Sequence, residues 1–263
     1  MWGRNMRVGK HVLNSGRSVL AAQYRRNVHP ALRAAISRRR IPAPPGQETL
    51  VSVIVNAADG TEHLELCLNS IVSHSYRNLE ILIVDNGIHG RVDARLRGYA
   101  RWDRRIAVVK PERQVTSVAR HRRALAGQYV MCVSARDTVV KDALRRLVKI
   151  LRLTDSDFSA GVVGYTAGER CWIPEQIGRL HMVDCFGVTS AGLTVPPDLS
   201  LSGKLFQVGF LADLGWTLDE HLHIAESGIM AAAYAGGRFD LVTTPVIWRG
   251  AGAEESVDLQ RRQ

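Results

Sequence analysis

Short apolar runs that stop abruptly at polar residues recur along the chain. They fall at residues 50–55, 79–84, 106–109 and 129–133. Apolar runs of this length, with little polar alternation, are typical of strands buried on both faces of a sheet. Between the runs, apolar residues recur at helical spacing, first at Leu64, Cys67, Leu68, Ile71 and Val72 and later at Val140, Leu144, Leu147, Val148 and Leu151. The alternation predicts an α/β domain in layers around a largely parallel sheet.

The chain is organised around the apolar run at residues 129–133. This run ends at Ser134, Arg136 and Asp137, and residues 138–142 are then expected to begin an amphipathic helix. Open α/β sheets bind ligands where buried strands end in polar turns. We therefore expect this turn to belong to the functional site.

The second half of the chain has a less regular pattern. Strands are expected at 158–165 and 241–246, and helices at 204–214 and 224–234, with Gly215 and Gly236 at the helix ends. The segment 166–202 reads as loop-rich, and no internal repeat is evident.

The formal net charge of +10 is concentrated at one end of the 263-residue chain. Residues 1–40 contain ten lysines and arginines and no acid, whereas the other 25 basic residues balance 25 acids. The prolines of residues 41–46 interrupt any helix and mark a boundary. We expect a basic arm and linker at 1–48, a globular domain at 49–252 and a polar tail at 253–263.

Several interpretations of the basic arm stay open. Its arginines, mixed with Trp2, Met6 and Leu13, suit the surface of an anionic membrane. Nucleic acid is the least favoured partner, because the arm has few aromatic side chains for base stacking and the rest of the chain is neutral. A solvated extension or an organellar transit peptide would have the same composition. No apolar run approaches the roughly 20 residues of a spanning helix, so we expect a cytoplasmic protein, with peripheral contact at the inner membrane face as an alternative.

The four cysteines lie far apart in the sequence and form no CxxC pair. Cys67 and Cys132 fall within apolar patterns, so we expect buried thiols rather than a disulfide or a metal site.

Four stretches in order carry a resemblance to a known family. They read VSVIVNAADGTEHLELCLNSIVSHSYRNLEILIVDNG at 51–87, SVARHRRALAGQYVMCVSARD at 117–137, SGKLFQVGFLADLGWTLDEHLHIAESGIMAAAY at 202–234, and PVIWR at 245–249. In this order they resemble the first two strands, the Ala-Arg-Asn helix with the Asp-x-Asp turn, the acceptor-side segment and the closing strand of family 2 glycosyltransferases. The resemblance covers roughly residues 50–250 and implies the GT-A fold, a Rossmann-like fold that binds nucleotide-diphospho-sugars.

The resemblance also implies roles for individual residues. Asn56 and Ala57, at the end of the first strand, are expected beside the nucleotide-sugar, and Asp85 is expected to contact its base. Arg120 matches the helix arginine that approaches the donor. The Asp-x-Asp turn of the family holds Mg²⁺ or Mn²⁺ against the diphosphate, and a Glu-Asp pair supplies the catalytic base.

The chain departs from the family pattern at these motifs. Asn56 stands where the family has proline, and Ala58 where it has an aromatic residue. The Asp-x-Asp positions read Ser134-Ala135-Arg136, so Asp137 is the acid left at the turn. Because Mg²⁺ and Mn²⁺ prefer carboxylate oxygens, these residues predict no ordinary metal site. The Glu-Asp pair reads Glu226-Ser227.

Each of these residues has two interpretations. The guanidinium of Arg136 either replaces the metal at the diphosphate or pairs with Asp137 or solvent at a decayed site. Glu226 is either the base that accepts the proton of the acceptor hydroxyl or a carboxylate that stabilises a helix N-terminus. Asp85 either contacts the nucleobase of the donor or stabilises the turn before Asn-Gly. Arg120 either binds a phosphate of the donor or lies on a solvated helix face.

Two hypotheses about function follow. The first is an inverting glycosyltransferase that moves a sugar from a nucleotide-sugar to a glycan or to a lipid-linked cell-envelope acceptor, without a required metal. The second is a catalytically inactive GT-A protein that binds at a membrane or on a partner transferase.

Overall fold

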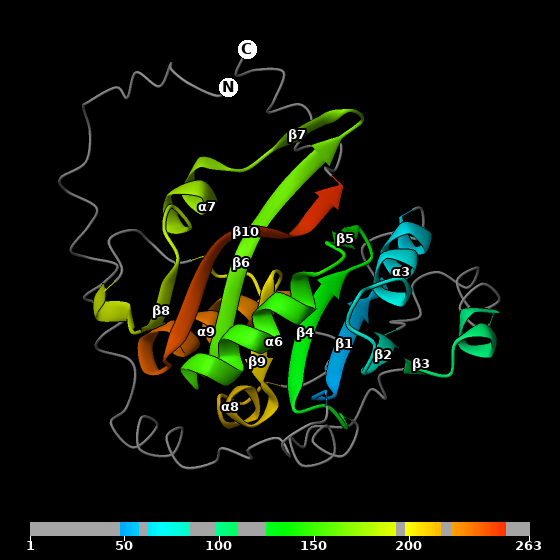
Figure 1. Cartoon of the computed structure of the whole chain (residues 1–263), viewed down its shortest axis with the longest axis horizontal. Coiled ribbons are helices and arrows are strands. Elements are labelled where there is room, and N and C mark those ends of the chain that lie inside the picture. The colour runs from blue at the N-terminus through cyan, green and yellow to red at the C-terminus, as the bar shows by residue number, and fades with distance from the viewer. Residues whose placement is uncertain are drawn as a thin grey trace.

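The computed structural model describes residues 48–57, 63–84, 98–109, 125–192, 198–216 and 222–250. Strands are numbered β1 Val51–Asn56, β2 Leu79–Val84, β3 Ile106–Val109, β4 Tyr129–Ser134, β5 Asp137–Val139, β6 Phe158–Ala167, β7 Arg170–Trp172, β8 Cys185–Val188, β9 Lys204–Gln207 and β10 Phe239–Gly250. Helices are α3 Leu64–Val72, α6 Ala143–Thr154, α7 Glu175–Leu180, α8 Val208–Asp213 and α9 Leu222–Gly236, with a short 3-10 turn, η2, at Ser190–Gly192. Figure 1 shows one sheet that runs across the molecule.

The strands form a ten-stranded sheet in the order β3-β2-β1-β4-β9-β6-β10-β5, with β7 beside β6 and β8 beside β10. Strands β3, β2, β1 and β4 are parallel neighbours, and β6 is parallel to β10. Strand β9 lies antiparallel between β4 and β6 and joins the two parallel groups. The predicted α/β fold with a central parallel sheet is confirmed.

Strand β1 is apolar at nearly every position because both of its faces are buried. Val51, Val53 and Val55 pack into the core beneath α3 and α6. Ile54 points the other way, into a core that contains residues of α8 and α9. A strand covered on both faces has no solvent-facing positions to mark with polar residues, so its sequence shows no alternation.

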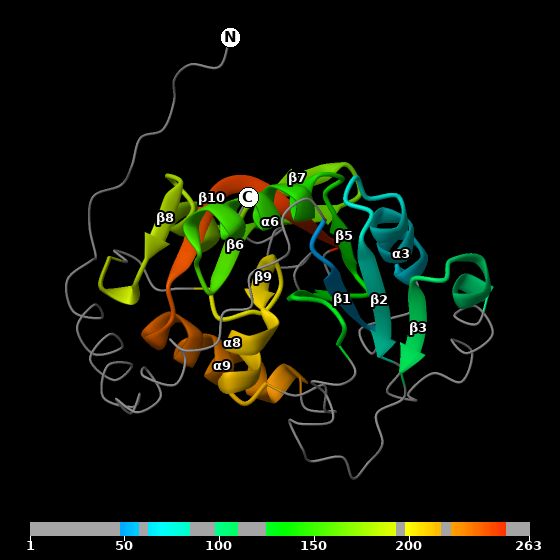
Figure 2. The ribbon, with the colours of Figure 1, turned by 60° about the horizontal axis from the view of Figure 1, so that its bottom comes forward.

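The helices lie in two layers, one on each face of the sheet (Figure 2). Helix α6 buries the five residues Ala143, Leu144, Leu147, Val148 and Leu151 against one face. On the other face, the rings of Phe206, Phe210, Tyr234 and Phe239 surround or adjoin Phe158 of β6, and Phe158 stacks on Phe239 at 5.1 Å.

Three element predictions are wrong. Residues 137–139 form β5 rather than the start of a helix, because they pair with Ile247–Arg249 of β10, and α6 begins only at Ala143. Residues 204–207 form β9 rather than a helix, with Leu205 and Phe206 facing opposite cores. The segment predicted to be loop-rich contains β7, α7 and β8.

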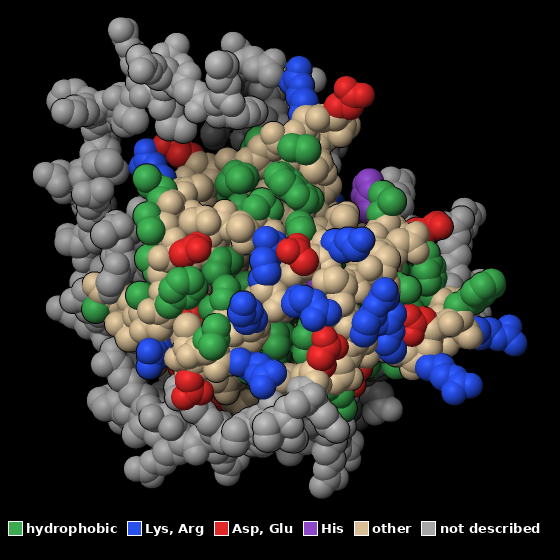
Figure 3. All heavy atoms as spheres, viewed as in Figure 1, with side chains coloured by type: hydrophobic (Ala, Val, Ile, Leu, Met, Phe, Trp, Pro, Cys, Tyr) green, Lys and Arg blue, Asp and Glu red, His purple; other side chains and the backbone are tan. Residues whose placement is uncertain are grey.

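The outer surface of α6 is basic. Arg145, Lys149 and Arg152 are exposed at intervals of four and three residues, which places them along one line of the helix, and the exposed Lys141 lies just before the helix begins. We call these four residues the α6 basic stripe. Figure 3 shows the basic side chains that gather on this face of the molecule.

Among the described residues, no helix is long and apolar enough to span a membrane.

Candidate functional site

The end of β1 and the end of β4 lie side by side. The two strands are parallel, and Asn56 stands opposite Ser134. The backbone N–H of Ala135 donates to the carbonyl oxygen of Asn56 at 2.9 Å. The structure therefore brings Asn56, Ala57 and Ser134 together at the edge of the sheet where the sequence predicts the site.

The turn after β4 is closed by its own side chains. The backbone N–H of Ser134 donates to Oδ2 of Asp137 at 2.8 Å, and the N–H of Arg136 donates to Oγ of Ser134 at 3.2 Å. Side chains that take up backbone N–H groups in this way hold a turn in one conformation. Ser134 thus supports the turn in addition to lying beside Asn56.

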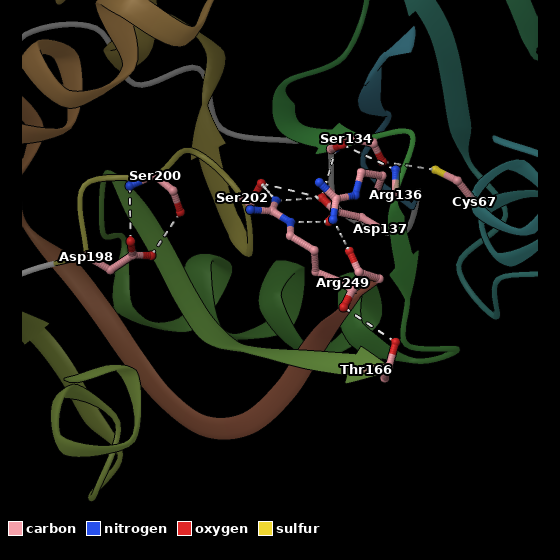
Figure 4. A network of polar contacts seen from close by, with 10 residues as sticks. Cys67, Ser134, Arg136, Asp137, Thr166, Asp198, Ser200, Ser202 and Arg249 are labelled. Carbon is pink, nitrogen blue, oxygen red and sulfur yellow. Dashed lines mark hydrogen bonds and ion pairs between the residues drawn. The ribbon is translucent and has the colours of Figure 1, made fainter. Parts of the chain in front are cut away.

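Asp137 forms a side-on ion pair with Arg249 of β10. Nε of Arg249 lies 2.7 Å from Oδ1 of Asp137, and Nη2 lies 3.0 Å from Oδ2 (Figure 4). Ser202 joins the pair, because its hydroxyl accepts from Nη2 of Arg249 and lies 3.4 Å from Oδ2 of Asp137. Burial alone would lower the pKa of Arg249, but the hydrogen bond and charge of Asp137 outweigh it and raise that pKa above its usual range.

Arg136 projects from the same turn and is tied to the end of β10. Its Nη2 atom donates to the carbonyl oxygen of Gly250 at 2.7 Å, and the N–H of Gly250 donates back to the carbonyl oxygen of Arg136 at 2.9 Å. The side chain is half-buried. With Asp137, Arg136 and Arg249 give this cluster one negative and two positive charges, so the turn is a positively charged site.

The turn does not fit a divalent cation. Mg²⁺ and Mn²⁺ take hard oxygen ligands, usually from more than one carboxylate or from water. Both oxygens of Asp137 already accept hydrogen bonds, and its side chain is fully buried against Arg249. In the described part of the chain, no three His, Cys, Asp or Glu side chains converge in an arrangement that would hold a metal ion.

A buried ion pair supports the loop that carries Ser202. Nζ of Lys204 lies 2.6 Å from Oδ2 of Asp198 and donates to the carbonyl oxygen of Ser200 at 2.7 Å. The side chain of Lys204 is 2% exposed. Burial alone would raise the pKa of Asp198, but Lys204 and Ser200 outweigh it and lower that pKa.

Sequence reasoning did not identify Arg249, Ser202, Asp198 or Lys204. Arg249 offered one usable signal, because an arginine directly after an apolar strand in an α/β domain is expected at the strand ends. Ser202 and Lys204 offered none, since their placement depends on β9 joining β4 to β6.

The thiol of Cys67 approaches the turn from α3 and donates to the carbonyl oxygen of Ser134 at 3.5 Å. Burial, with the charge of Asp137 as the second cause, raises the pKa of Cys67 above its usual range, so the group stays an uncharged thiol. Cys67 and Cys132 are buried, as predicted, whereas Cys171 is exposed and Cys185 is half-buried.

For three predicted site residues, Asp85, Arg120 and Glu226, the structure describes no side-chain contact. Asp85 and Arg120 lie outside the described residues. The backbone of Glu226 lies in α9, which begins at Leu222 rather than at the predicted Ile224. Glu226 is therefore beyond the first helical turn, where the field of the helix dipole has largely faded.

The chain matches the sequence model of glycosyl transferase family 2 over residues 52–213, which is more than half of its length. Glycosyltransferase GlyA of Streptococcus pneumoniae is 27% identical over 113 residues, which are 42% of this chain and 16% of GlyA. EpsJ of Bacillus subtilis, an uncharacterized glycosyltransferase, is 27% identical over 131 residues, which are 49% of this chain and 38% of EpsJ. The matched regions therefore span less than half the length of these curated relatives.

Solved structures give a matching fold. TarS of S. aureus, in complex with UDP-GlcNAc, has a TM-score of 0.64 and 18% identity, over 78% of this chain and 60% of the TarS chain. GalNAc-T7 with UDP, GalNAc and Mn²⁺ has a TM-score of 0.57 and 16% identity, over 81% of this chain and 45% of that chain. Likeness at this level of identity concerns the fold alone.

Proposed function

Because the chain belongs to glycosyl transferase family 2, we propose that it transfers a glycosyl group from a nucleotide-sugar to a hydroxyl group of a glycan or cell-envelope acceptor. The nucleotide donor is supported by the solved complexes of similar fold, which contain UDP or UDP-GlcNAc. In this proposal, Asn56, Ala57 and Ser134 line the donor side of the site, with Asp85 and Arg120 as further donor contacts.

The proposed transfer inverts the configuration at the sugar C1. The acceptor oxygen attacks C1 from the face opposite the diphosphate, and the C1–O bond to the diphosphate breaks. Glu226 accepts the proton of the acceptor hydroxyl. The guanidinium of Arg136 stabilises the negative charge that develops on the nucleoside diphosphate as it leaves.

The observation that carries this proposal is the side-on pair between Asp137 and Arg249. The pair neutralises the one acid of the turn, so Asp137 neither repels a diphosphate nor offers a carboxylate to a metal. Arg136, on the same turn, then supplies a permanent positive charge with the planar geometry that binds phosphate oxygens in pairs. We therefore propose that donor binding needs no divalent cation.

Calorimetric titration with UDP, GDP and CDP, each in Mn²⁺ and in EDTA, tests the proposal. We expect one nucleotide to bind the wild type equally in both buffers and to bind Arg136→Ala about tenfold or more weakly, because hydrogen bonds to charged groups are lost. Arg146→Ala is the matched control, since Arg146 is also half-buried and donates to a backbone carbonyl, that of Pro245, at 2.9 Å.

Each other outcome has a defined meaning. Binding that requires Mn²⁺ would remove the role proposed for Arg136. If the wild type bound none of the three nucleotides, the transferase proposal would be overturned and the catalytically inactive alternative would be favoured.

We also propose that the protein contacts an anionic membrane surface peripherally through the α6 basic stripe. The four side chains of the stripe are exposed, Arg145 pairs with Glu48 at 3.3 Å, and Leu153 beside Arg152 is 75% exposed. Basic clusters on amphipathic helices bind anionic headgroups with about 1 kcal/mol for each Lys or Arg near the surface. A lipid-linked acceptor would place the substrate at that surface.

Co-sedimentation with phosphatidylglycerol-containing vesicles and with pure phosphatidylcholine vesicles tests this contact. We expect binding to the anionic vesicles, weakened about tenfold or more by Lys149→Glu with Arg152→Glu. Arg101→Glu with Arg104→Glu changes two exposed arginines outside α6 and serves as the control. Equal losses in the two double variants would contradict a specific role of the stripe.

A further inference from the structure

A row of four residues crosses four neighbouring strands beside the turn. Trp172 of β7 stands opposite Tyr165 of β6, Tyr165 stands opposite Arg249 of β10, and Arg249 stands opposite Asp137 of β5. Residues in direct register project toward the same face of a sheet. Two aromatic rings and the ion pair therefore share one face.

The members of the row also contact one another. The rings of Tyr165 and Trp172 stack with centroids 5.6 Å apart and planes inclined by 26°. Arg249, which holds Asp137, lies directly beside Tyr165 in the register of β10 and β6. The aromatic pair is thus held in a fixed position relative to the turn.

The aromatic pair is only partly covered by the protein. Tyr165 and Trp172 are both half-buried, and their neighbours Arg170 and Cys171 on β7 are exposed. The opposite face of the hairpin is filled, because Trp248 lies so close to Gly164 that a Cβ atom there would be 2.3 Å from its ring. The accessible side of the aromatic pair is therefore the side that also carries Arg249.

The row runs away from the strand on which the donor residues lie. Asn56 and Ser134 meet on the β1 side of the turn, whereas β10, β6 and β7 follow on the other side of Asp137. A donor beside β1 would leave the surface over β10, β6 and β7 for the second substrate. The donor and the acceptor would then meet at the turn from opposite sides, as a transfer reaction requires.

We propose that Tyr165 and Trp172 form a platform in which Tyr165 backs one face of Trp172 and the other face of Trp172 binds a pyranose ring of the acceptor glycan. The face of a β-pyranose presents several C–H groups with partial positive charge, and the face of an aromatic ring carries partial negative charge. Ligand sites commonly combine such an apolar surface with a few polar groups that fix orientation. This inference rests on the proposed transferase function, because it assigns the acceptor of that reaction.

Saturation-transfer NMR provides a binding test that does not need turnover. The probes are methyl β-D-glucopyranoside, methyl β-D-galactopyranoside and methyl 2-acetamido-2-deoxy-β-D-glucopyranoside. We expect at least one to receive saturation mainly at the protons of one ring face. Trp172→Ala should weaken its binding about tenfold, and Trp172→Phe should restore most of it. Trp102→Ala, which removes a tryptophan that is 91% exposed and outside the row, should have no effect.

Nucleotide titration on the same variants separates this inference from the proposed function. If Trp172→Ala loses glycoside binding and still binds nucleotide as the wild type does, the platform and the donor site are both supported. The platform would be overturned if the wild type bound none of the three glycosides, or if Trp172→Ala left glycoside binding unchanged. Absence of nucleotide binding by the wild type would overturn the transferase proposal, and the platform would fall with it as an acceptor site.

Discussion

Arg249 and Asp137 form a side-on ion pair in which Nε and Nη2 lie 2.7 and 3.0 Å from the two carboxylate oxygens. The side chain of Asp137 is fully buried, and that of Arg249 is 20% exposed. The pair joins β5 to β10 directly beside the turn that follows β4. The acid of that turn is therefore committed to the structure of the site, which leaves Arg136 as the charged group with a proposed role in donor binding.

The first prediction concerns the stability provided by this pair. Asp137→Asn keeps the shape of the side chain but leaves the guanidinium of Arg249 without its carboxylate. We expect the free energy of unfolding to fall by about 3–5 kcal/mol, because loss of one partner strands a largely buried charge. Urea denaturation followed by circular dichroism measures the change.

Asp142→Asn is the matched control for Asp137→Asn. Asp142 pairs with Arg146 at 3.5 Å, and its side chain is 54% exposed, so solvent screens the interaction. We expect a change below about 1 kcal/mol. A similar loss in both variants would show that the buried pair has no special weight in the fold.

The second prediction concerns the contact between β1 and the start of β4. A Cβ atom on Gly127 would lie 2.6 Å from the backbone nitrogen of Ser52 and 2.4 Å from its Oγ. Gly127→Ala should therefore push the strands apart and lower the free energy of unfolding by about 1–3 kcal/mol. In Gly98→Ala, a Cβ atom would meet no atom within 4 Å. Gly98 lies in a helical segment, at least residues 98–102, so this variant should be neutral or more stable by about 0.5–1 kcal/mol. Equal thermal shifts in the two variants would contradict the steric explanation.

The parallel strands could be predicted because burial on both faces of the sheet gives each strand a short run of apolar residues without polar alternation. Residues 79–84 and 106–109 were predicted without error, and they form β2 and β3. Residues 50–55 differ from β1 by one residue at each end, and residues 129–133 differ from β4 by one residue at the carboxyl end. In each case, an apolar run ends at a polar residue, and both features follow from a strand inside a three-layer domain.

Strands β5 and β9 could not be predicted from local sequence. Thr138 and Val139 extend an apolar pattern that also suits the start of α6, and pairing with β10 decides their conformation. Leu205 and Phe206 fit either a short buried strand or a helix, because such runs carry no period of their own. The pairing of Arg249 with Asp137 was missed for the same reason, since it depends on β10 lying beside β5.

The third prediction concerns the ion pair beneath the loop of Ser202. Lys204→Met should lower the free energy of unfolding by about 3–5 kcal/mol, because Asp198 then loses its cation in a largely buried setting. The double variant Lys204→Met with Asp198→Asn should recover part of this loss, since no charge is stranded. Urea denaturation of the wild type, Lys204→Met, Asp198→Asn and the double variant gives the coupling energy. Strictly additive losses would mean that the two groups act independently.

The last prediction concerns stability in acid and depends on two buried histidines. His74 is fully buried, and the N–H of Tyr76 donates to its Nδ1 atom at 2.9 Å, which requires that nitrogen to be unprotonated. His181 is 6% exposed, and its Nδ1 atom lies 2.9 Å from the carbonyl oxygen of Val242. Burial lowers the pKa of each to about 4, and Lys204 is the second cause for His181.

Both shifts have the same consequence for stability. In the unfolded chain, each histidine takes up a proton below its usual pKa of about 6.5, whereas the folded protein leaves both neutral down to about pH 4. The free energy of unfolding should therefore fall as the pH decreases from about 6.5 to 4, by up to about 3 kcal/mol for each histidine. Asp240 opposes this trend, because burial raises its pKa and its protonation favours the folded state.

Urea denaturation at a series of pH values between 7.5 and 4.5 measures this slope. His74→Gln removes one of the two titrating groups, so its free energy of unfolding should depend less steeply on pH than that of the wild type. His63→Gln removes an exposed histidine and should keep the wild-type slope. If the three proteins show parallel pH dependence, protonation of His74 does not contribute to acid unfolding, and the loss of stability must come from other groups that bind protons more tightly in the unfolded chain.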